Sequence, residues 1–344
     1  MTDTVPTPGA RALEPLPPVE RVRRGLWSIP VPIPDNPLRY VLVYLFETDR
    51  GPYIVDAGWN TDEAWDTLVA GIAAAGGSIA DVRGVLVTHI HPDHYGLAGR
   101  VREASGAWVA LHPADAALIG ARYDAPADLV ESMAAQLRRN GAPADEVAAL
   151  AAASMPVWPR VDPVHPDVLL EDGDRPEVPG WDLTAVWTPG HSPGHLCFAE
   201  AGQRLVLSGD HVLPRITPHI GYHPQAGPDP LGDYLRSLER VADLPADEVL
   251  PAHEHRFADL PGRVAELRAH HEAHFAEVLA AIDAGTTTAW AIAATFHWSR
   301  PWDELKGWSR RAAVGEALAH LRALEVRGVV REVVGEPSRW ERVG

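Results

Sequence analysis

Two residue types that often carry chemistry are nearly absent from this sequence. Among 344 residues, Cys197 is the single cysteine and Lys306 the single lysine. One cysteine excludes an internal disulfide and a cysteine-based zinc site. Because Cys197 lies in a strand-like segment, 196–199, it is expected to be a small core residue rather than a nucleophile. One lysine leaves almost no candidate for Schiff-base catalysis.

Long apolar segments are also missing. No run reaches the roughly 18 apolar residues that a membrane-spanning helix needs. Residues 1–18 are rich in proline and alanine and lack the apolar core of a signal peptide. We therefore expect a cytoplasmic protein without membrane contact. Its 344 residues suffice for one catalytic domain and a smaller module.

Positive charge is scarce in most of the chain. The sequence has 30 Lys+Arg against 47 Asp+Glu, a net charge of -17. Residues 262–344 hold 11 of each sign, so the preceding part, with 19 basic and 36 acidic residues, carries the whole excess. Nucleic-acid binding depends on cationic groups that displace counterions from phosphates. We therefore expect a small-molecule substrate and no nucleic-acid partner.

Histidine, in contrast, is abundant, and the segment His89-Ile90-His91-Pro92-Asp93-His94 is the most informative in the chain. It places four metal-competent side chains directly after the strand-like run 85–87. Imidazole nitrogen suits zinc and iron, and carboxylate oxygen tolerates harder ions. A loop of this kind can therefore supply ligands to two metal ions.

Three further candidate ligands each follow a short strand-like run. These are His191 after residues 181–187, Asp210 after residues 205–207, and His253 after residues 249–250. Loops just beyond strand ends are where a rigid scaffold holds metal ligands within small tolerances. The pattern therefore predicts one metal site built from four loops.

In this order, the candidates resemble the ligand set of the metallo-β-lactamase superfamily over roughly residues 25–255. The seven positions are His89, His91, Asp93, His94, His191, Asp210 and His253. The resemblance implies an α/β fold, the αβ/βα sandwich of two mixed sheets flanked by helices. It further implies one ion held by His89, His91 and His191, a second held by Asp93, His94 and His253, and a bridge through Asp210.

Two positions narrow the branch of this superfamily. Asp210 stands where class B β-lactamases commonly have cysteine, and His91 where flavodiiron oxygen reductases have glutamate. The pattern is therefore closer to the glyoxalase II, lactonase and ribonuclease-like branches. The resemblance implies two divalent ions, with zinc as the preferred candidate and iron or manganese as alternatives. A hydroxide bridging such ions attacks without a side-chain nucleophile. Asp93 and Asp210 are the expected catalytic residues, and Asp93 is placed to orient the hydroxide or accept its proton.

Three functions follow from this resemblance. The leading hypothesis is a dinuclear metal-dependent hydrolase that uses a metal-bridging hydroxide on a small-molecule ester, thioester or lactone. The alternative is an endoribonuclease or another phosphodiesterase of the same superfamily, which steep salt dependence would identify. The third is a mononuclear iron persulfide dioxygenase, which requires one iron ion and oxygen uptake.

The sequence divides into a catalytic domain, residues 1–261, and a C-terminal module, residues 262–344. The catalytic domain opens with strands at 21–32 and 40–46 and contains a helical insertion at about 113–170. The C-terminal helices and final hairpin resemble the winged helix of some β-lactamase-like proteins. Because this module is neutral, we expect it to close the pocket or to pair two copies of the chain in a homodimer.

Two smaller motifs have structural interpretations. Asp56 ends a strand-like run, where a loop hydrogen bond is expected. His270, His271 and His274 lack the spacing of a zinc-protease helix, because the histidine that is followed by Glu272 is not four residues from another histidine. These helix histidines are expected to pack or to face solvent.

Substrate contacts are predicted in two places. Within the insertion, Met133 and Trp158 line an apolar pocket if the insertion acts as a lid, and otherwise its helices only thicken the fold. In the proline-rich loop after the bridging ligand, His219, Tyr222 and His223 are candidates to donate to a substrate carbonyl or carboxylate. The alternative is that these three side chains anchor their own loop.

Overall fold

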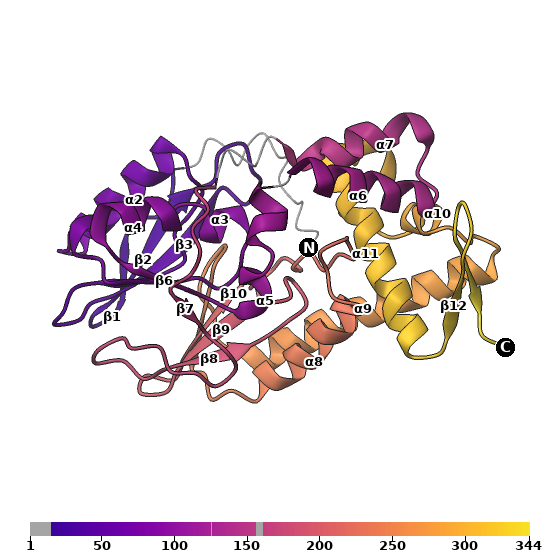
Figure 1. Ribbon diagram of the computed structural model, residues 1–344. Coiled ribbons are helices and arrows are strands. Elements are labelled where there is room, and N and C mark those ends of the chain that lie inside the picture. The colour runs from indigo at the N-terminus through magenta and orange to yellow at the C-terminus, as the bar shows by residue number, and fades with distance from the viewer. Residues whose placement is uncertain (1–14, 125, 156–160) are drawn as a thin grey trace.

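Two β-sheets pack face to face in the computed structural model, which describes residues 15–124, 126–155 and 161–344 (Figure 1). The larger sheet has the order β1 (Glu20–Arg23), β2 (Leu26–Pro32), β3 (Tyr40–Phe46), β4 (Tyr53–Val55), β5 (Gly84–Leu86), β6 (Trp108–Leu111) and β7 (Val168–Leu169). The smaller sheet has the order β11 (Glu248–Pro251), β10 (Leu205–Gly209), β9 (Leu196–Glu200) and β8 (Leu183–Trp187). Strands β4 to β7 run parallel, as do β10 and β11, and the other neighbouring pairs are antiparallel.

The opening strand that the sequence predicts over residues 21–32 is in fact two strands. Gly25 has φ +80, a conformation that residues with a side chain rarely adopt, and the chain turns there between β1 and β2. The two strands then pair antiparallel, with Glu20 opposite Ser28. The runs before the candidate ligands are strands close to their predicted positions.

Alternation of side chains along β10 divides the interior. Leu205 and Leu207 face the larger sheet and join Tyr44 and Phe198 in one apolar cluster. Val206 faces the other way and belongs to the cluster beneath the outer helices. Because neighbouring residues of a strand point to opposite faces, the smaller sheet is buried on both sides.

Helices cover the outer face of each sheet (Figure 1). Helices α2 (Asp62–Ala74) and α4 (Ala98–Ser105) lie on the larger sheet, and α8 (Pro230–Ala242) and α9 (Leu260–Asp283) lie on the smaller one. The Thr61 side chain caps α2 by accepting from the Ala64 N–H, and the buried Leu68 and Ile72 pack toward the sheet. The fold is therefore the αβ/βα sandwich that the resemblance implies.

Further helices and a hairpin complete the fold. The helices are η1 (Ile79–Asp81), α3 (Pro92–Tyr95), α5 (Pro113–Ala116), η2 (Gly120–Asp124), α6 (Pro126–Arg139), α7 (Ala144–Ala151), α10 (Ala289–Ala293), η4 (Trp302–Glu304) and α11 (Gly307–Val326). Strands β12 (Val330–Val333) and β13 (Arg339–Arg342) form the predicted C-terminal hairpin, although its identity as the wing of a winged helix stays a prediction. In the part of the chain that the structure describes, every helix is too short or too polar to cross a membrane.

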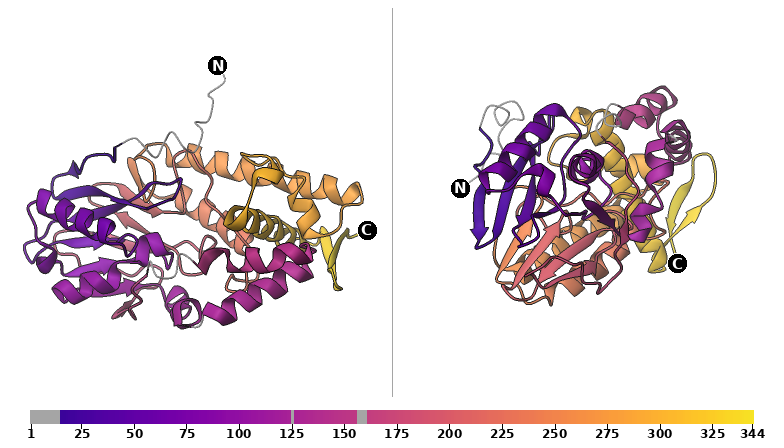
Figure 2. Two further views of the ribbon diagram at one scale, coloured as in Figure 1. Left: turned by 90° about the horizontal axis from the view of Figure 1, so that it is seen from above. Right: turned by 60° about the vertical axis from the view of Figure 1, so that its left-hand side comes forward.

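Helices α6 and α7 of the predicted insertion pack on the C-terminal helices, at the end of the molecule farthest from the larger sheet (Figures 1 and 2). The last residues of the insertion form β7, which pairs with β6 in the larger sheet. Arg310 of α11 forms an ion pair of 2.8 Å with Glu146 of α7, and Arg311 donates to the carbonyl of Leu150. One apolar cluster extends from the smaller sheet through α8 and α9 to α11. The core thus continues across the predicted boundary at residue 261, and the division into two domains stays a prediction.

Candidate metal centre

Loops at the carboxyl ends of four strands bring the predicted ligands together. The loop after β5 carries His89 and His91 and leads into α3, which carries Asp93 and His94. The loops after β8, β10 and β11 carry His191, Asp210 and His253. All seven side chains are buried or half-buried. They form three overlapping groups whose ligand atoms lie within 4.8 Å of one another. The structure therefore places the seven predicted residues in one cluster.

Three imidazoles form the first group. Nε2 of His89 lies 2.9 Å from Nδ1 of His91, and the same Nδ1 lies 2.9 Å from Nε2 of His191. Three nitrogen atoms therefore converge on one point. Such a triangle of imidazole nitrogens is the donor set of a three-histidine zinc site.

The other two groups share His94 and combine imidazoles with carboxylates. We call Asp93, His94, Asp210 and His253 together the second group. Nε2 of His253 lies 3.3 Å from Oδ2 of Asp93 and 3.2 Å from Oδ1 of Asp210. Nε2 of His94 lies 3.6 Å and 3.5 Å from the same two oxygen atoms. The other oxygen of Asp210, Oδ2, lies 3.5 Å from Nε2 of His191. Asp210 thus turns one oxygen toward each group, as a bridging ligand must.

Three atoms of this cluster are buried without a hydrogen-bond partner among the described residues. They are Nε2 of His94, Nε2 of His253 and Oδ1 of Asp210. An unpaired buried polar atom costs about 1–3 kcal/mol, so three of them at one place require an explanation. Each is a lone-pair donor directed at the same space, which divalent cations would fill. The residues present therefore fit a pair of metal ions.

The remaining nitrogen of three ligand histidines is held by an oxygen atom. The pairs are Nδ1 of His94 with Oδ2 of Asp56 at 2.8 Å, Nδ1 of His191 with the His219 carbonyl at 2.9 Å, and Nδ1 of His253 with the Tyr40 carbonyl at 2.9 Å. A proton held on Nδ1 leaves the lone pair on Nε2, the nitrogen that faces the cluster. The surrounding oxygen atoms therefore prepare these imidazoles for a metal.

Asp56, at the end of β4, links this arrangement to the His-rich loop. Its carboxylate accepts from the Thr88 N–H at 2.8 Å and from the Thr88 hydroxyl at 3.0 Å, in addition to His94. Asp56 has φ 62, a left-handed conformation that aspartate tolerates better than most residues. The hydrogen bond that the sequence predicts for Asp56 therefore orients a candidate ligand.

Burial and nearby carboxylates act in opposite directions on the two groups. Burial lowers the pKa of His191 to about 4 and holds the pKa of the other two first-group imidazoles well below its usual value. These imidazoles are neutral at pH 7 and offer lone pairs to a cation. Burial also opposes charge on His253, but Asp210 and Asp93 outweigh it and raise the pKa of His253 to about 10. The carboxylates therefore draw positive charge, as a proton or a metal ion, to the second group.

Glycine precedes two of the ligands for steric reasons. Gly190 has φ +141, and a Cβ at this position would lie 2.5 Å from Cβ of Tyr234. Gly209 has φ +51, and a Cβ would lie 2.7 Å from Nε2 of His195. Glycine at these positions allows the close backbone approach that places the following ligand in the cluster.

Two buried polar residues that the sequence did not indicate hold the ligand loops together. Asp115 accepts from the N–H groups of Ile90 at 2.9 Å and Gly194 at 2.7 Å, which joins the loops after β5 and β8. Nε2 of His195 accepts from the N–H of Asp210 at 3.1 Å. These partners lie 15 to 79 residues apart in the sequence, so no local motif reveals them.

A pocket of about 210 Å³ lies beside His191 and includes one predicted substrate residue, His223. Trp187 and Asp233 are also part of its wall. The Trp187 ring stacks on His112 with a centroid separation of 5.1 Å, which holds the indole in place. Of the predicted substrate residues in the described part of the chain, His223 is therefore the one that reaches the pocket next to the ligands.

The other predicted substrate residues face the C-terminal helices or cannot be placed. Nδ1 of His219 lies 3.6 Å from Oε2 of Glu316, and the Tyr222 ring packs against an arginine of α11. Met133 packs against the apolar cluster of these helices, as expected if the insertion only thickens the fold. Trp158 lies outside the described residues. A role of the insertion as a lid stays a prediction.

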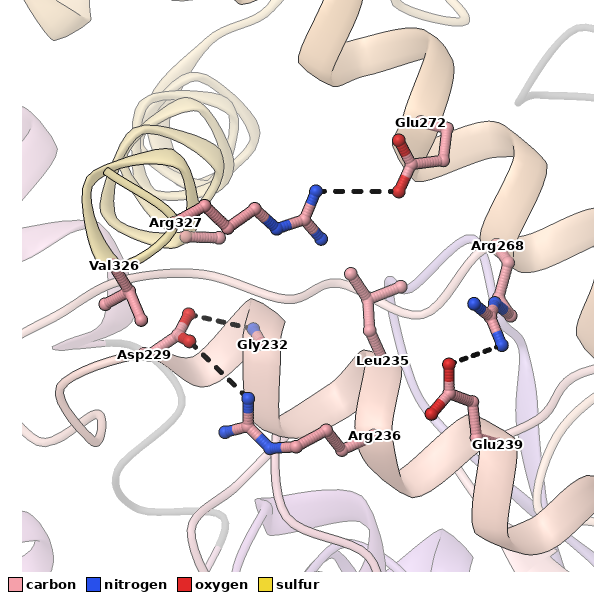
Figure 3. Close-up of a pocket in the computed structure, with 10 residues that line it drawn as sticks. Asp229, Gly232, Leu235, Arg236, Glu239, Arg268, Glu272, Val326 and Arg327 are labelled. Carbon is pink, nitrogen blue, oxygen red and sulfur yellow. Dashed lines mark hydrogen bonds and ion pairs between the residues drawn. The ribbon is translucent and has the colours of Figure 1, made fainter. Parts of the chain in front are cut away.

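A second pocket, of about 180 Å³, lies between α8, α9 and α11 (Figure 3). Its ion pairs join Arg236 to Asp229 at 3.8 Å, Arg268 to Glu239 at 2.7 Å and Arg327 to Glu272 at 3.6 Å. Because each guanidinium faces a carboxylate, this pocket has little net positive charge to attract a phosphate.

Comparisons with known proteins agree with this geometry. Residues 36–253 match the metallo-beta-lactamase superfamily. A metallo-beta-lactamase family protein from Thermus thermophilus has a similar structure, with a TM-score of 0.80 and 33% identity over 94% of this chain and 100% of that one. A beta-lactamase domain protein from Burkholderia ambifaria has a TM-score of 0.80 and 29% identity over 99% and 96% of the two chains.

Curated relatives match over shorter stretches. The lactamase-like protein adaB of Aspergillus niger is 36% identical over 114 residues, so the match spans 33% of that protein's length. The acyl-coenzyme A thioesterase MBLAC2 of Gallus gallus is 28% identical over 223 residues, which are 62% of this chain and 73% of that protein. Together, the fold and the ligand cluster define an enzyme of the metal-dependent hydrolase class. The chain belongs to the metallo-beta-lactamase superfamily.

Proposed function

We propose that this enzyme holds two divalent metal ions, with zinc as the preferred candidate, and hydrolyses a small-molecule thioester, ester or lactone. The observation that carries this proposal is the convergence of three unpartnered buried atoms, on His94, His253 and Asp210, beside a triangle of imidazole nitrogens. Bound ions would lower the pKa of a shared water molecule and polarise the substrate carbonyl. A side-chain nucleophile is then unnecessary, and burial raises the pKa of the Cys197 thiol to about 12, which keeps it unreactive.

Asp93 is the residue best placed to orient the attacking water molecule. Burial opposes its negative charge, but His94 and His253 hold its pKa well below the usual value, so the carboxylate is ionised at neutral pH. Its side chain remains 14% exposed, more than those of His94 and His253. Oδ2 of Asp93 can therefore accept a hydrogen bond from the attacking water molecule and orient it.

One observation favours a thioester among the three substrate types, and the pocket is compatible with all three. The pocket beside His191 has room for a small group next to the ligands, and Trp187 gives part of its wall an apolar surface. The thioesterase of Gallus gallus is a relative that covers 62% of this chain, which favours a thioester. The acidic catalytic part and the paired arginines of Figure 3 support a small molecule over nucleic acid.

Metal counting and a substrate panel test this proposal. Protein that has been stripped by a chelator should lose hydrolysis of a short acyl thioester and regain it with zinc. His191→Ala should remove the first-group ion, His253→Ala the second, and Asp210→Ala both. His165→Ala, which removes an exposed histidine outside the cluster, is the control.

Three results would contradict the proposal. One is full thioester hydrolysis after complete removal of metal. Another is a zinc content that His191→Ala and His253→Ala leave unchanged. The third is cleavage of RNA with an affinity that falls steeply as salt increases, because this behaviour would identify a phosphodiesterase instead.

A further inference from the structure

Another cluster of metal-competent side chains lies between α9 and α11, apart from the seven candidate ligands of the metal centre. His270 and His274 stand one helical turn apart on α9, with ring centroids 4.3 Å apart. Glu316 of α11 faces them, and one potential ligand atom of each residue lies within 4.8 Å of the others. The two imidazoles therefore come from one helix and the carboxylate from a facing helix.

His274 is an unpartnered donor within this group. It is 5% exposed, and its Nδ1 has no hydrogen-bond partner among the described residues. Oε1 of Glu316 lies 4.0 Å from this nitrogen, which is too far for a hydrogen bond. A buried nitrogen and a carboxylate oxygen that face each other across this distance leave a position for an ion between them.

Glu316 keeps its negative charge although its side chain is only 13% exposed. Burial opposes that charge, but His219 and the other neighbouring imidazoles outweigh it and lower the pKa of Glu316 to about 2. The nearest of these imidazoles, that of His219, has its Nδ1 3.6 Å from Oε2. The carboxylate thus lacks a close partner, since the imidazoles of His219 and His274 that the structure pairs with it lie 3.6 Å and 4.0 Å away.

The neighbouring histidines are already engaged with each other. Nδ1 of His271 lies 3.2 Å from Nε2 of His320, and Nδ1 of His320 donates to the Glu316 carbonyl at 2.8 Å. These contacts leave His270 and His274, in addition to His219, as the imidazoles that face the carboxylate. His270 is half-buried, so an ion could reach the group from solvent.

We propose that His270, His274 and Glu316 bind one divalent transition-metal ion such as Zn²⁺. Two imidazoles and one carboxylate are a donor set that zinc accepts, and solvent would complete the coordination. The ion would join α9 to α11 beside His219, whose carbonyl holds Nδ1 of the candidate ligand His191. Its role would be to fix the C-terminal helices against the loop that supports the metal centre.

Zinc titration of the stripped, full-length protein tests this site. The wild-type chain should bind one more Zn²⁺ per chain than His270→Ala and Glu316→Gln, whose affinity for that ion should fall at least 10-fold. His297→Ala should bind like the wild type, because this histidine of the same module has an 89% exposed side chain. The additional ion should also persist in the His191→Ala/His253→Ala double variant, which separates it from the metal centre.

Anomalous diffraction at the zinc edge provides a direct second measurement. A peak between His270, His274 and Glu316 in zinc-loaded crystals supports the site. The same zinc stoichiometry in the wild type and in His270→Ala overturns the proposed site. Because His270 is only half-buried, His270→Ala is the variant that is expected to fold. Loss of the ion from His297→Ala as well would also overturn the assignment.

Discussion

Replacing Asp56 with asparagine should weaken metal binding without removing any ligand. One oxygen of Asp56 now accepts from the Thr88 N–H and the other pairs with Nδ1 of His94, each at 2.8 Å. The amide of asparagine keeps one of these oxygens, and an NH₂ group takes the place of the other. Two donors would then face each other, whichever way the amide is turned. If the His94 proton moves to Nε2 to relieve this clash, the lone pair that faces the metal centre is lost.

The expected loss is 10- to 100-fold in zinc affinity, or about 1.4–2.8 kcal/mol. The free energy of unfolding should also fall by about 1–3 kcal/mol, because a buried donor loses its acceptor. Backbone strain should not contribute, since asparagine tolerates the left-handed conformation at this position.

Competition with a chelator of known affinity measures the zinc affinity, and urea unfolding of stripped protein measures the stability. Asp229→Asn is the matched control, because Asp229 caps α8 by accepting from the Gly232 N–H and touches none of the seven ligands. Wild-type zinc affinity in Asp56→Asn would refute the inference that this carboxylate sets the tautomer of His94.

Two further variants test the scaffold around the ligands. Gly190→Ala should lower the free energy of unfolding by about 1–3 kcal/mol more than Gly180→Ala. A Cβ at Gly190 would lie 2.5 Å from Cβ of Tyr234, whereas a Cβ at Gly180, where φ is +84, would have nothing within 4 Å. Equal losses in urea unfolding would show that the clash is relieved. Burial lowers the pKa of His223 to about 3, and its Nδ1 accepts from the Gln225 N–H at 3.2 Å. The unfolded chain takes up this proton near pH 6.5, so the stability that is complete above that pH falls as the pH drops toward 3. His223→Gln should make that fall shallower in urea unfolding between pH 6.5 and 4, and an unchanged slope would contradict the assignment.

The cluster of candidate ligands could be predicted from the sequence because each candidate lies next to a strand with a clear apolar pattern. The His-rich loop follows β5, and Asp210 follows β10, whose alternating Leu205, Val206 and Leu207 fill the two faces of the smaller sheet. Local periodicity therefore indicated both the strand and the loop beyond it. The same locality explains why Asp115 could not be predicted, since its three acceptor contacts reach 25, 77 and 79 residues along the chain.

The residue that lines the pocket was harder to predict, because this depends on how the loop after Asp210 lies in space. His219, Tyr222 and His223 have similar sequence surroundings, but only the last of them lines the pocket beside His191. The first two instead face α11, almost 100 residues later in the chain. Residue type and spacing could not distinguish these orientations, because a helix far away in the sequence decides them.

The C-terminal helices hold the loop that supports the metal centre. This contact is a structural role for the C-terminal residues that does not depend on their charge. Arg263 of α9 donates to the Leu213 carbonyl at 2.7 Å, and the Gly315 carbonyl of α11 accepts from the same loop at 2.8 Å. Between these two attachments, the His219 carbonyl accepts from Nδ1 of His191 at 2.9 Å. Because a loop fixed at both ends loses little further freedom when a metal binds, these helices can maintain the geometry of the centre without contacting substrate.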